Sequence, residues 1–264
     1  MYNPVDRRLV VGAGWLGEPL AREWQDHGHK VVVTTRNEER IVQLQASGLQ
    51  TWRLDLADAG ESYGLEQRLA PFACICFAVP PARSSAPKTY AEWIARILRA
   101  WPYNPSKTVL FISSTGVYPP QTDEYDESSE VLVDHAVVLA EREVQQWGNN
   151  YRILRCGGLA DERRVIARYW SGKVLEEADQ PVNWVHRDDV IGALNFLEEQ
   201  AISGIFNVVA PLHPERRGVA RQQSERYGFA PPAHETEGGK RRIIQPKALL
   251  ELGFVFKHPD PLSF

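Results

Sequence analysis

Apolar and polar positions follow two alternating patterns along the first part of the chain. Short, nearly continuous apolar runs predict strands buried on both faces, at residues 9–11, 30–35, 51–56, 73–79, 108–113 and 151–155. Between these runs, apolar positions with helical spacing predict helices at residues 15–27, 38–46, 88–101 and 133–147, and a shorter crossover at 63–69. Strands that alternate with helices are typical of parallel sheets. The pattern therefore predicts an α/β fold with a doubly wound parallel sheet.

A glycine-rich turn joins the first predicted strand to the first predicted helix. It contains Gly12, Gly14, Trp15, Leu16 and Gly17, in the spacing Gly-x-Gly-x-x-Gly. In this motif the first glycine permits a tight turn, the second lets the backbone approach a pyrophosphate, and the third lets helix and strand pack closely. Amides at a helix N-terminus attract phosphate, so the turn predicts a dinucleotide-binding (Rossmann) domain. A glycine turn without a ligand is the alternative.

The pattern changes after Cys156, where Gly157 and Gly158 interrupt the chain. The remaining residues combine strand-like runs at 183–185 and 205–209 with helical patterns at 188–199, 214–227 and 246–252. Polar loops are expected at 119–129, 230–239 and 258–264. We therefore predict an NAD(P)-binding Rossmann domain at residues 1–157. Residues 158–264 are expected to form a smaller substrate-binding lobe that partly returns to the Rossmann core.

Composition and charge exclude several classes of function. The chain has 264 residues and a net charge of −4, which disfavours general binding to nucleic acid or an anionic membrane. No apolar stretch is long enough to cross a bilayer, and residues 1–8 leave no room for a signal peptide. Cys74, Cys76 and Cys156 are expected to be buried free thiols in a reducing compartment, which predicts a cytoplasmic protein. No group of residues has metal-ligand spacing along the sequence, so no metal site is predicted.

Further motifs occur in a fixed order. They are Asp-Leu-Ala-Asp at 55–58, Ala-Val-Pro-Pro at 78–81, Ile-Ser-Ser-Thr-Gly-Val-Tyr at 112–118, Asn-Trp-Val-His-Arg-Asp-Asp-Val at 183–190 and Phe-Asn-Val-Val at 206–209. With the glycine turn, they make the chain resemble extended or atypical short-chain dehydrogenases/reductases of the NAD-dependent epimerase/dehydratase group. The resemblance covers nearly the whole chain and implies an NAD(P)-binding Rossmann fold. It implies no single reaction, because one such fold hosts many chemistries.

The end of the second predicted strand indicates which dinucleotide is preferred. In such folds an acid at this position binds the ribose of NAD, whereas a nearby arginine accommodates the extra phosphate of NADP. Here the strand ends at Thr35 and Arg36, with no acid, which favours NADP over NAD. The alternative is that Arg36 pairs with Glu38 or Glu39 on the surface.

The resemblance places other residues at the cofactor. It implies that Asp55 lies near the adenine, or else caps a helix, and that Ala78, Val79 and Pro80 line the cofactor after the fourth strand. Trp15 covers the pyrophosphate or packs on Pro80.

The catalytic residues of the resembled family are only partly present. Ser114 matches the family's catalytic hydroxyl, which hydrogen-bonds the reacting oxygen; a turn-capping hydroxyl is the alternative. The family's Tyr-x-x-x-Lys is missing from the helix expected at 133–147, where His135 and Leu139 occupy the corresponding positions. His135 could move the proton instead, or could be a helix-start histidine. Tyr118 could do so from its loop, or could be a packing aromatic.

Two functions remain open from the sequence. One is an NADP-binding oxidoreductase or epimerase-like enzyme that acts on a small polar, perhaps sugar-like, substrate. The other is a non-catalytic NADP-binding sensor or regulatory protein. His186, Arg187 and Asp188 could line the substrate side, or the acids could stabilise a helix start. The run 240–242, ending at Arg242, could hold an anionic substrate group or could simply be solvated. The helices at 88–101 and 133–147 could pair in a homodimer.

Overall fold

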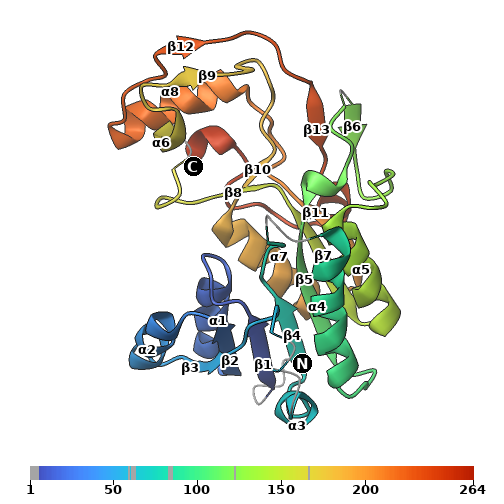
Figure 1. Ribbon diagram of the computed structural model, residues 1–264. Coiled ribbons are helices and arrows are strands. Elements are labelled where there is room, and N and C mark those ends of the chain that lie inside the picture. The colour runs from blue at the N-terminus through green and yellow to red at the C-terminus, as the bar shows by residue number, and fades with distance from the viewer. Residues whose placement is uncertain (1–5, 59, 61–63, 83–85, 122, 166) are drawn as a thin grey trace. The chain divides into compact units, whose positions relative to one another are not determined.

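The computed structural model describes residues 6–58, 60, 64–82, 86–121, 123–165 and 167–264 (Figure 1). Tyr63, the first residue of the expected crossover at 63–69, lies outside this range. Contacts divide the chain into two compact units. The first contains Met1–Ser113, Val133–Ile153 and Leu197–Gly204, and the second contains Ser114–Leu132, Leu154–Phe196 and Ile205–Phe264. The chain thus passes between the units several times, once at Leu154, close to the domain boundary expected at residue 157.

A seven-stranded sheet in the order β11-β7-β5-β4-β1-β2-β3 is the core of the fold. Its strands are β1 (Arg7–Val11), β2 (Lys30–Thr35), β3 (Gln50–Arg53), β4 (Cys74–Phe77), β5 (Thr108–Ser114), β7 (Tyr151–Cys156) and β11 (Gly204–Val208). The pairs β1–β2, β1–β4, β2–β3 and β4–β5 are parallel. This confirms the predicted α/β parallel sheet.

The strand order reverses direction at β1, which lies between β2 and β4. From β1 the sheet grows through β2 and β3 on one side and through β4 and β5 on the other. Ligands of open parallel sheets bind where the order reverses, outside the carboxyl ends of the strands. The turns that follow β1, β2 and β4 therefore meet at the edge where a dinucleotide is expected.

Apolar strand residues form the core of the first unit. Leu9, Val33, Ile75, Val109 and Leu110 are fully buried. Helices α1 (Gly17–Asp26), α2 (Glu38–Ala46), α3 (Leu65–Leu69), α4 (Pro87–Ala100) and α5 (Ala136–Trp147) flank the strands of this unit, and α4 packs along α5 (Figure 1). The apolar face of each amphipathic helix is turned toward this core. No helix in the described part of the chain is long and apolar enough to span a membrane.

The second unit adds short paired strands and further helices. Its strand pairs are β6 (Asp123–Tyr125) with β13 (Arg242–Ile244), β8 (Gly158–Ala160) with β10 (Trp184–His186), and β9 (Val174–Leu175) with β12 (His234–Glu235). Its helices are η2 (Thr115–Val117), α6 (Ala167–Trp170), α7 (Arg187–Glu199, whose last turn belongs to the first unit), α8 (Arg216–Tyr227), α9 (Lys247–Glu251) and η3 (Pro261–Ser263). Small apolar clusters hold these pieces, one around Ala160, Ala210 and Phe264, and another around Leu175, Ala178 and Ala220.

Several predicted elements differ from the structure. The strand expected at 205–209 is β11, which belongs to the central sheet, so the sheet does not end with the strand at 151–155. The loops expected at 119–129 and 230–239 contain β6 and β12. These strands have three and two residues and pair with distant segments, so they leave no periodic signal in the sequence. Helix α5 begins at Ala136 rather than at residue 133, because His135 has an extended backbone and caps the helix.

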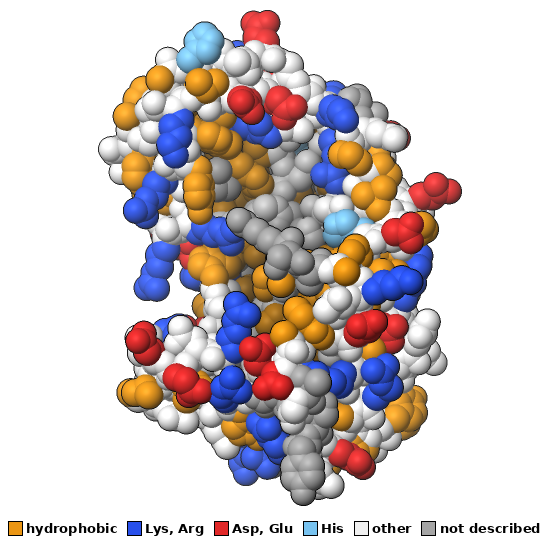
Figure 2. All heavy atoms as spheres, viewed as in Figure 1, with side chains coloured by type: hydrophobic (Ala, Val, Ile, Leu, Met, Phe, Trp, Pro, Cys, Tyr) orange, Lys and Arg blue, Asp and Glu red, His pale blue; other side chains and the backbone are white. Residues whose placement is uncertain are grey.

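Surface charge and cysteine burial agree with the composition. On the face shown in Figure 2, positive and negative side chains are interspersed rather than gathered by sign. Cys74, Cys76 and Cys156 are buried free thiols, and burial raises the pKa of Cys74 and of Cys156 to about 12.

Candidate functional site

A cavity of about 360 Å³ lies in the first unit, at the carboxyl ends of β1, β2 and β4. Its wall comes from four segments and one helix. The lining residues are Val11, Gly12, Ala13, Gly14, Thr34, Thr35, Arg36, Leu54, Asp55, Leu56, Ala57, Ala78, Val79, Pro80, Pro81, Ala82 and Trp93. The structure thus brings together eight of the residues that the sequence assigns to the cofactor. Trp15, Leu16 and Gly17 follow directly in the chain but do not line this cavity.

The three glycines of the turn have different surroundings. Gly12 has a φ of +106°, and a Cβ there would collide with Val79 and approach the carbonyl oxygen of Ala78. A Cβ on Gly17 would collide with the carbonyl oxygen of Gly12, so helix α1 can pack this closely only on glycine. Gly14 is exposed, and a Cβ there would meet nothing within 4 Å. Only Gly14 therefore leaves open space next to the backbone, where a phosphate could approach.

The N-terminus of α1 is suited to an anion. Leu16 is the capping residue and has no side-chain hydrogen bond to the first turn. The turn itself is fixed from the next strand, because Gly12 N donates to the Thr34 hydroxyl at 3.1 Å and Ala13 N donates to the Thr34 carbonyl at 2.7 Å. A fixed, uncapped helix start presents amides and the positive end of the helix dipole to a ligand.

The tip of β2 carries an arginine that has no acidic partner. Arg36 lines the cavity, its side chain is exposed, and it makes no ion pair or hydrogen bond with the described residues. The surface pairing considered from the sequence does not form with Glu38, which instead forms an ion pair with Arg53 at 3.0 Å. Thr35 stands beside Arg36, and its hydroxyl accepts from Asn37 N at 3.3 Å. The guanidinium is therefore available to an anionic group of a ligand.

Asp55 lies in the loop after β3 and lines the same cavity. Its carboxylate accepts from Ala57 N at 3.0 Å, which shapes a turn rather than capping a helix. Arg96 on α4 holds this loop by donating to the carbonyls of Leu56 at 2.8 Å and Asp58 at 3.0 Å. This wall of the cavity is thereby tied to α4.

The segment after β4 supplies the opposite wall. The hydroxyl of buried Tyr90 donates to the Val79 carbonyl at 2.7 Å, which fixes the backbone next to Pro80. Trp93, one turn further along α4, lines the cavity with a half-buried indole. Trp93 is one of the apolar positions of the helix predicted at 88–101, and the sequence did not assign it to the site. Positions that face the core and positions that line a site recur with the same helical period, so the pattern alone does not distinguish them.

Ser114 ends β5, where its hydroxyl accepts from Gly116 N at 3.0 Å. It thus caps the short helix η2, the alternative that the sequence left open. An accepting hydroxyl keeps its own proton to donate, so capping leaves a hydrogen bond to a substrate oxygen available. The neighbouring Ser113 is buried and donates to the buried carboxylate of Glu141.

His135 caps helix α5, and its Nδ1 accepts from Val137 N at 3.3 Å. Burial lowers the pKa of His135 below its usual value, although Glu141 nearby acts in the opposite direction. The imidazole is therefore neutral at physiological pH, with Nδ1 as the acceptor from Val137 N and the ring proton on Nε2.

Tyr118 lies in a buried hydrogen-bond network of the second unit. Its side chain is 1% exposed. The hydroxyl donates to Asn207 Oδ1 at 2.8 Å and accepts from Arg155 at 3.0 Å. Burial raises the pKa of Tyr118 despite these partners. Such contacts are those of a packing residue, and the phenol has no exposure with which to reach a substrate.

The second unit contains a separate cavity of about 430 Å³. Trp170 and Trp184 stack at its wall with ring centroids 6.0 Å apart, and Arg216 and Arg242 line it. Burial lowers the pKa of both arginines, which are held by carbonyl groups: Arg216 donates to the Glu176 carbonyl at 2.8 Å and Arg242 to the Thr115 carbonyl at 2.5 Å. Of the basic run at 240–242, only Arg242 lines this cavity.

Comparisons with known proteins agree with this geometry. A family model described as NAD(P)H-binding matches residues 12–193. The Escherichia coli (strain K12) protein YeeZ is 29% identical over 268 residues, covering 96% of this chain and 96% of YeeZ. A human epimerase family protein with NADPH has a TM-score of 0.75 at 17% identity and covers 97% of each chain. UDP-glucuronic acid 4-epimerase from Bacillus cereus, in complex with NAD, has a TM-score of 0.77 at 15% identity, covering 97% of this chain and 96% of that one.

The family model covers most of the chain, including the glycine turn and the segments that form the first cavity. The solved structures show the shared fold, at identities too low to carry a reaction across. By the family match, the chain belongs to the NAD(P)H-binding family, and its cavity geometry and sheet order agree with that assignment.

Proposed function

We propose that this protein is an NADP-dependent enzyme of oxidoreductase or epimerase type that acts on a small polar substrate. The observation that carries the cofactor preference is Arg36, which lines the first cavity at the tip of β2 without an acidic partner among the described residues. Charge-assisted hydrogen bonds to a phosphate contribute about 1.5–3 kcal/mol. The N-terminus of α2 begins at Glu38, directly after Arg36 and Asn37, and its dipole adds to the attraction.

The residues around the first cavity fit a dinucleotide in three ways. The uncapped start of α1 and the open backbone at Gly14 suit a pyrophosphate. The loop at Asp55 suits the adenosine side. When bound, NADPH supplies a hydride. The proposal assigns Ser114 to hydrogen-bond the reacting oxygen and His135 to move its proton. Tyr118 is left out, because its hydroxyl is buried and engaged.

The substrate class follows from the second cavity. Arg242, half-buried and without an acidic partner among the described residues, favours an anionic group, whereas Arg216 already pairs with Glu177 at 3.6 Å. The stacked Trp170 and Trp184 favour a flat or sugar-like ring. We therefore propose a small polar substrate that carries a phosphate or carboxylate.

A regulatory NADP sensor is the second candidate. It is favoured by helix α5, which has no tyrosine or lysine and carries Leu139 where the resembled family has its lysine. Leucine cannot bind a ribose hydroxyl or lower the pKa of a neighbour. The two functions differ in turnover rather than in cofactor binding.

Fluorescence titration of the purified protein with NADPH and NADH tests the cofactor proposal. We expect NADPH to bind ~10- to 100-fold more tightly than NADH. This factor corresponds to the free energy of the hydrogen bonds between arginine and phosphate given above. Arg36→Ala should remove this preference by weakening NADPH alone. Arg53→Ala is the matched control, because Arg53 already pairs with Glu38. Equal affinity in the wild type, or an unchanged preference in Arg36→Ala, would refute the assignment.

Turnover separates the enzyme from the sensor. Anionic aldehydes and ketones are mixed with NADPH, and nucleotide sugars with NADP⁺. The absorbance of the reduced nicotinamide and the products are followed. Consumption of any member supports the enzyme. Tight NADPH binding without consumption or isomerisation of any member supports the sensor.

A further inference from the structure

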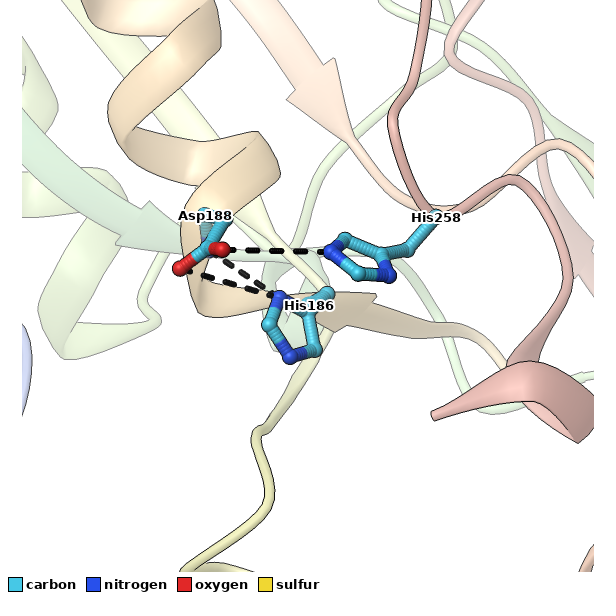
Figure 3. A group of neighbouring side chains, drawn as sticks. All are labelled: His186, Asp188 and His258. Carbon is cyan, nitrogen blue, oxygen red and sulfur yellow. Dashed lines mark hydrogen bonds and ion pairs between the residues drawn. The ribbon is translucent and has the colours of Figure 1, made fainter.

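We propose that His186, Asp188 and His258 form a binding site for a divalent transition metal of the zinc class, in the second unit and independent of the proposed function. His186 ends strand β10, Asp188 lies in the first turn of α7, and His258 lies in the C-terminal segment. One ligand atom from each side chain lies within 4.8 Å of the other two. Figure 3 shows the carboxylate of Asp188 directed toward both imidazoles.

The donor set selects the class of metal. Two imidazoles and one carboxylate are the ligands of many three-residue zinc sites, in which water or a ligand takes the fourth position. Harder cations such as Mg²⁺ and Ca²⁺ prefer oxygen ligands throughout. The site therefore suits Zn²⁺, Co²⁺, Ni²⁺ or Cu²⁺, and leaves at least one position open.

The distances between the carboxylate oxygens and the imidazole nitrogens are longer than hydrogen bonds. They are close to the distance between two ligand atoms on one metal ion. Asp188 Oδ1 lies 3.9 Å from His186 Nδ1, and Asp188 Oδ2 lies 3.8 Å from His258 Nε2. Two ligands bound to zinc at about 2.1 Å in tetrahedral geometry are about 3.4 Å apart. Asp188 is the most exposed of the three side chains, so its carboxylate has room to rotate toward a metal ion.

His258 supplies the strongest sign that a partner belongs here. Its Nε2 is buried and has no hydrogen-bond partner among the described residues. A buried polar atom without a partner costs free energy, which a metal ligand bond would remove. The backbone at this position is fixed, since the carboxylate of Asp189 accepts from Lys257 N at 2.6 Å and from His258 N at 3.0 Å. The ring of His258 lies against that of His186, with centroids 3.8 Å apart.

Surrounding charges both support and oppose metal binding. The carboxylate of Glu162 lies 3.6 Å from His186 Nε2, where it can orient the ring while Nδ1 binds the metal. Against this, His186 Nδ1 accepts weakly from Asp188 N at 3.3 Å, a bond that the metal would replace.

Lys257 competes for the same carboxylate. Its Nζ lies 3.2 Å from Asp188 Oδ2, and its side chain is 70% exposed. A flexible, exposed lysine can swing into water when a metal binds, but its charge weakens the site. Removing this charge should therefore strengthen metal binding, a result that a merely structural cluster would not give.

Titration of the chelator-treated full-length protein with Co²⁺ tests the proposal. We expect one equivalent to bind with visible d–d absorption typical of four- or five-coordination, and Zn²⁺ to displace it. His258→Gln and Asp188→Asn should each weaken binding by at least ~100-fold, more than the loss of an outer-shell partner. Lys257→Gln should tighten binding ~2- to 5-fold.

His234→Gln is the matched control, because His234 is an exposed histidine of the same unit. It should leave the Co²⁺ spectrum and affinity unchanged. A signal lost in His234→Gln and kept in His258→Gln would overturn the site. So would the absence of a saturable one-to-one signal in the wild type. Circular dichroism of each variant without metal distinguishes a lost ligand from a lost fold.

Discussion

The cavities of the two units are built from different kinds of residue. The first is formed by backbone, glycine, alanine and proline, with Arg36 and Asp55 as the charged side chains of its wall. The second is formed by large side chains, among them Trp170, Trp184, Arg216 and Arg242. A site made of backbone is specified by a short motif and serves one type of ligand. A site made of side chains changes with each substitution.

The two cavities also differ in which residues constrain the ligand. In the first cavity the steric demands fall on Gly12 and Gly17, which a Cβ would push against backbone or Val79. In the second, half-buried Arg242 donates to backbone carbonyls and has no acidic partner among the described residues, so its guanidinium can bind a complementary group. We infer that the first cavity binds the dinucleotide common to the family and that the second cavity determines substrate specificity.

Substitution within the glycine turn should have the largest effect on the free energy of unfolding. In Gly17→Ala, the new methyl group meets the carbonyl oxygen of Gly12 and lies 3.0 Å from Val10 Cγ1. We expect the free energy of unfolding to fall by about 3 kcal/mol. The matched control is Gly14→Ala, whose methyl meets nothing within 4 Å and should change stability by less than about 0.5 kcal/mol while weakening NADPH. Urea denaturation and NADPH titration measure both quantities, and equal loss of stability in the two variants would contradict this account.

The glycine turn shows why the first cavity could be predicted. Its function depends on residues that lie close together in the sequence, so the motif, the strand before it and the helix after it carry the information. Helix α2 and strand β2 have the bounds that the sequence predicts, because their periods and the Asn37 cap are local. The segments at Asp55 and Val79 were placed by their order after successive strands.

The second unit could not be predicted in the same way. Strands β6 and β13 pair across more than a hundred residues and are three residues long, so neither has a periodic pattern. The ligands of the proposed metal site are also far apart in the chain, since His258 lies 72 residues after His186. The packing of Tyr118 depends on Arg155 and Asn207, which only the fold brings together.

Removal of the Tyr118 hydroxyl should have the next largest effect on stability. Tyr118→Phe leaves Asn207 Oδ1 and one Arg155 donor without this partner in a buried site, which costs about 1–3 kcal/mol. Tyr125→Phe is the control, because Tyr125 is buried against Tyr118 and its hydroxyl makes no hydrogen bond with the described residues. Thermal unfolding should show a loss in the first variant alone, with NADPH affinity unchanged in both. Lost turnover without lost stability would instead give Tyr118 a catalytic role.

Acid should weaken the first unit through His29. Burial, with Arg8 nearby, lowers the pKa of His29 from 6.5 to about 4. The unfolded chain therefore takes up a proton below pH 6.5 that the folded chain refuses until about pH 4. This contribution to stability is complete above pH 6.5 and is lost as the pH falls toward 4. At pH 5 the loss in the free energy of unfolding is about 2 kcal/mol.

Urea denaturation between pH 7 and pH 4 measures the slope. His29→Asn should flatten it, whereas His234→Asn, at an exposed position, should leave it unchanged. Because the test compares slopes, a uniform loss of stability in His29→Asn does not obscure it. A wild-type slope retained in His29→Asn would assign the acid sensitivity elsewhere.

Ser114→Ala should have the smallest effect on stability and separates the two functions. The variant loses the cap on Gly116 N, which costs about 0.5–1 kcal/mol. NADPH affinity should be unchanged, because Ser114 does not line the first cavity. If the protein is an enzyme, the turnover number should fall by ~100-fold, since a positioned hydrogen bond to the reacting oxygen is removed. Ser113→Ala is a poor control, because it leaves buried Glu141 without a donor, whereas Ser106→Ala changes an exposed serine only. Full turnover in Ser114→Ala would leave this residue as a cap alone and would place the chemistry on other groups.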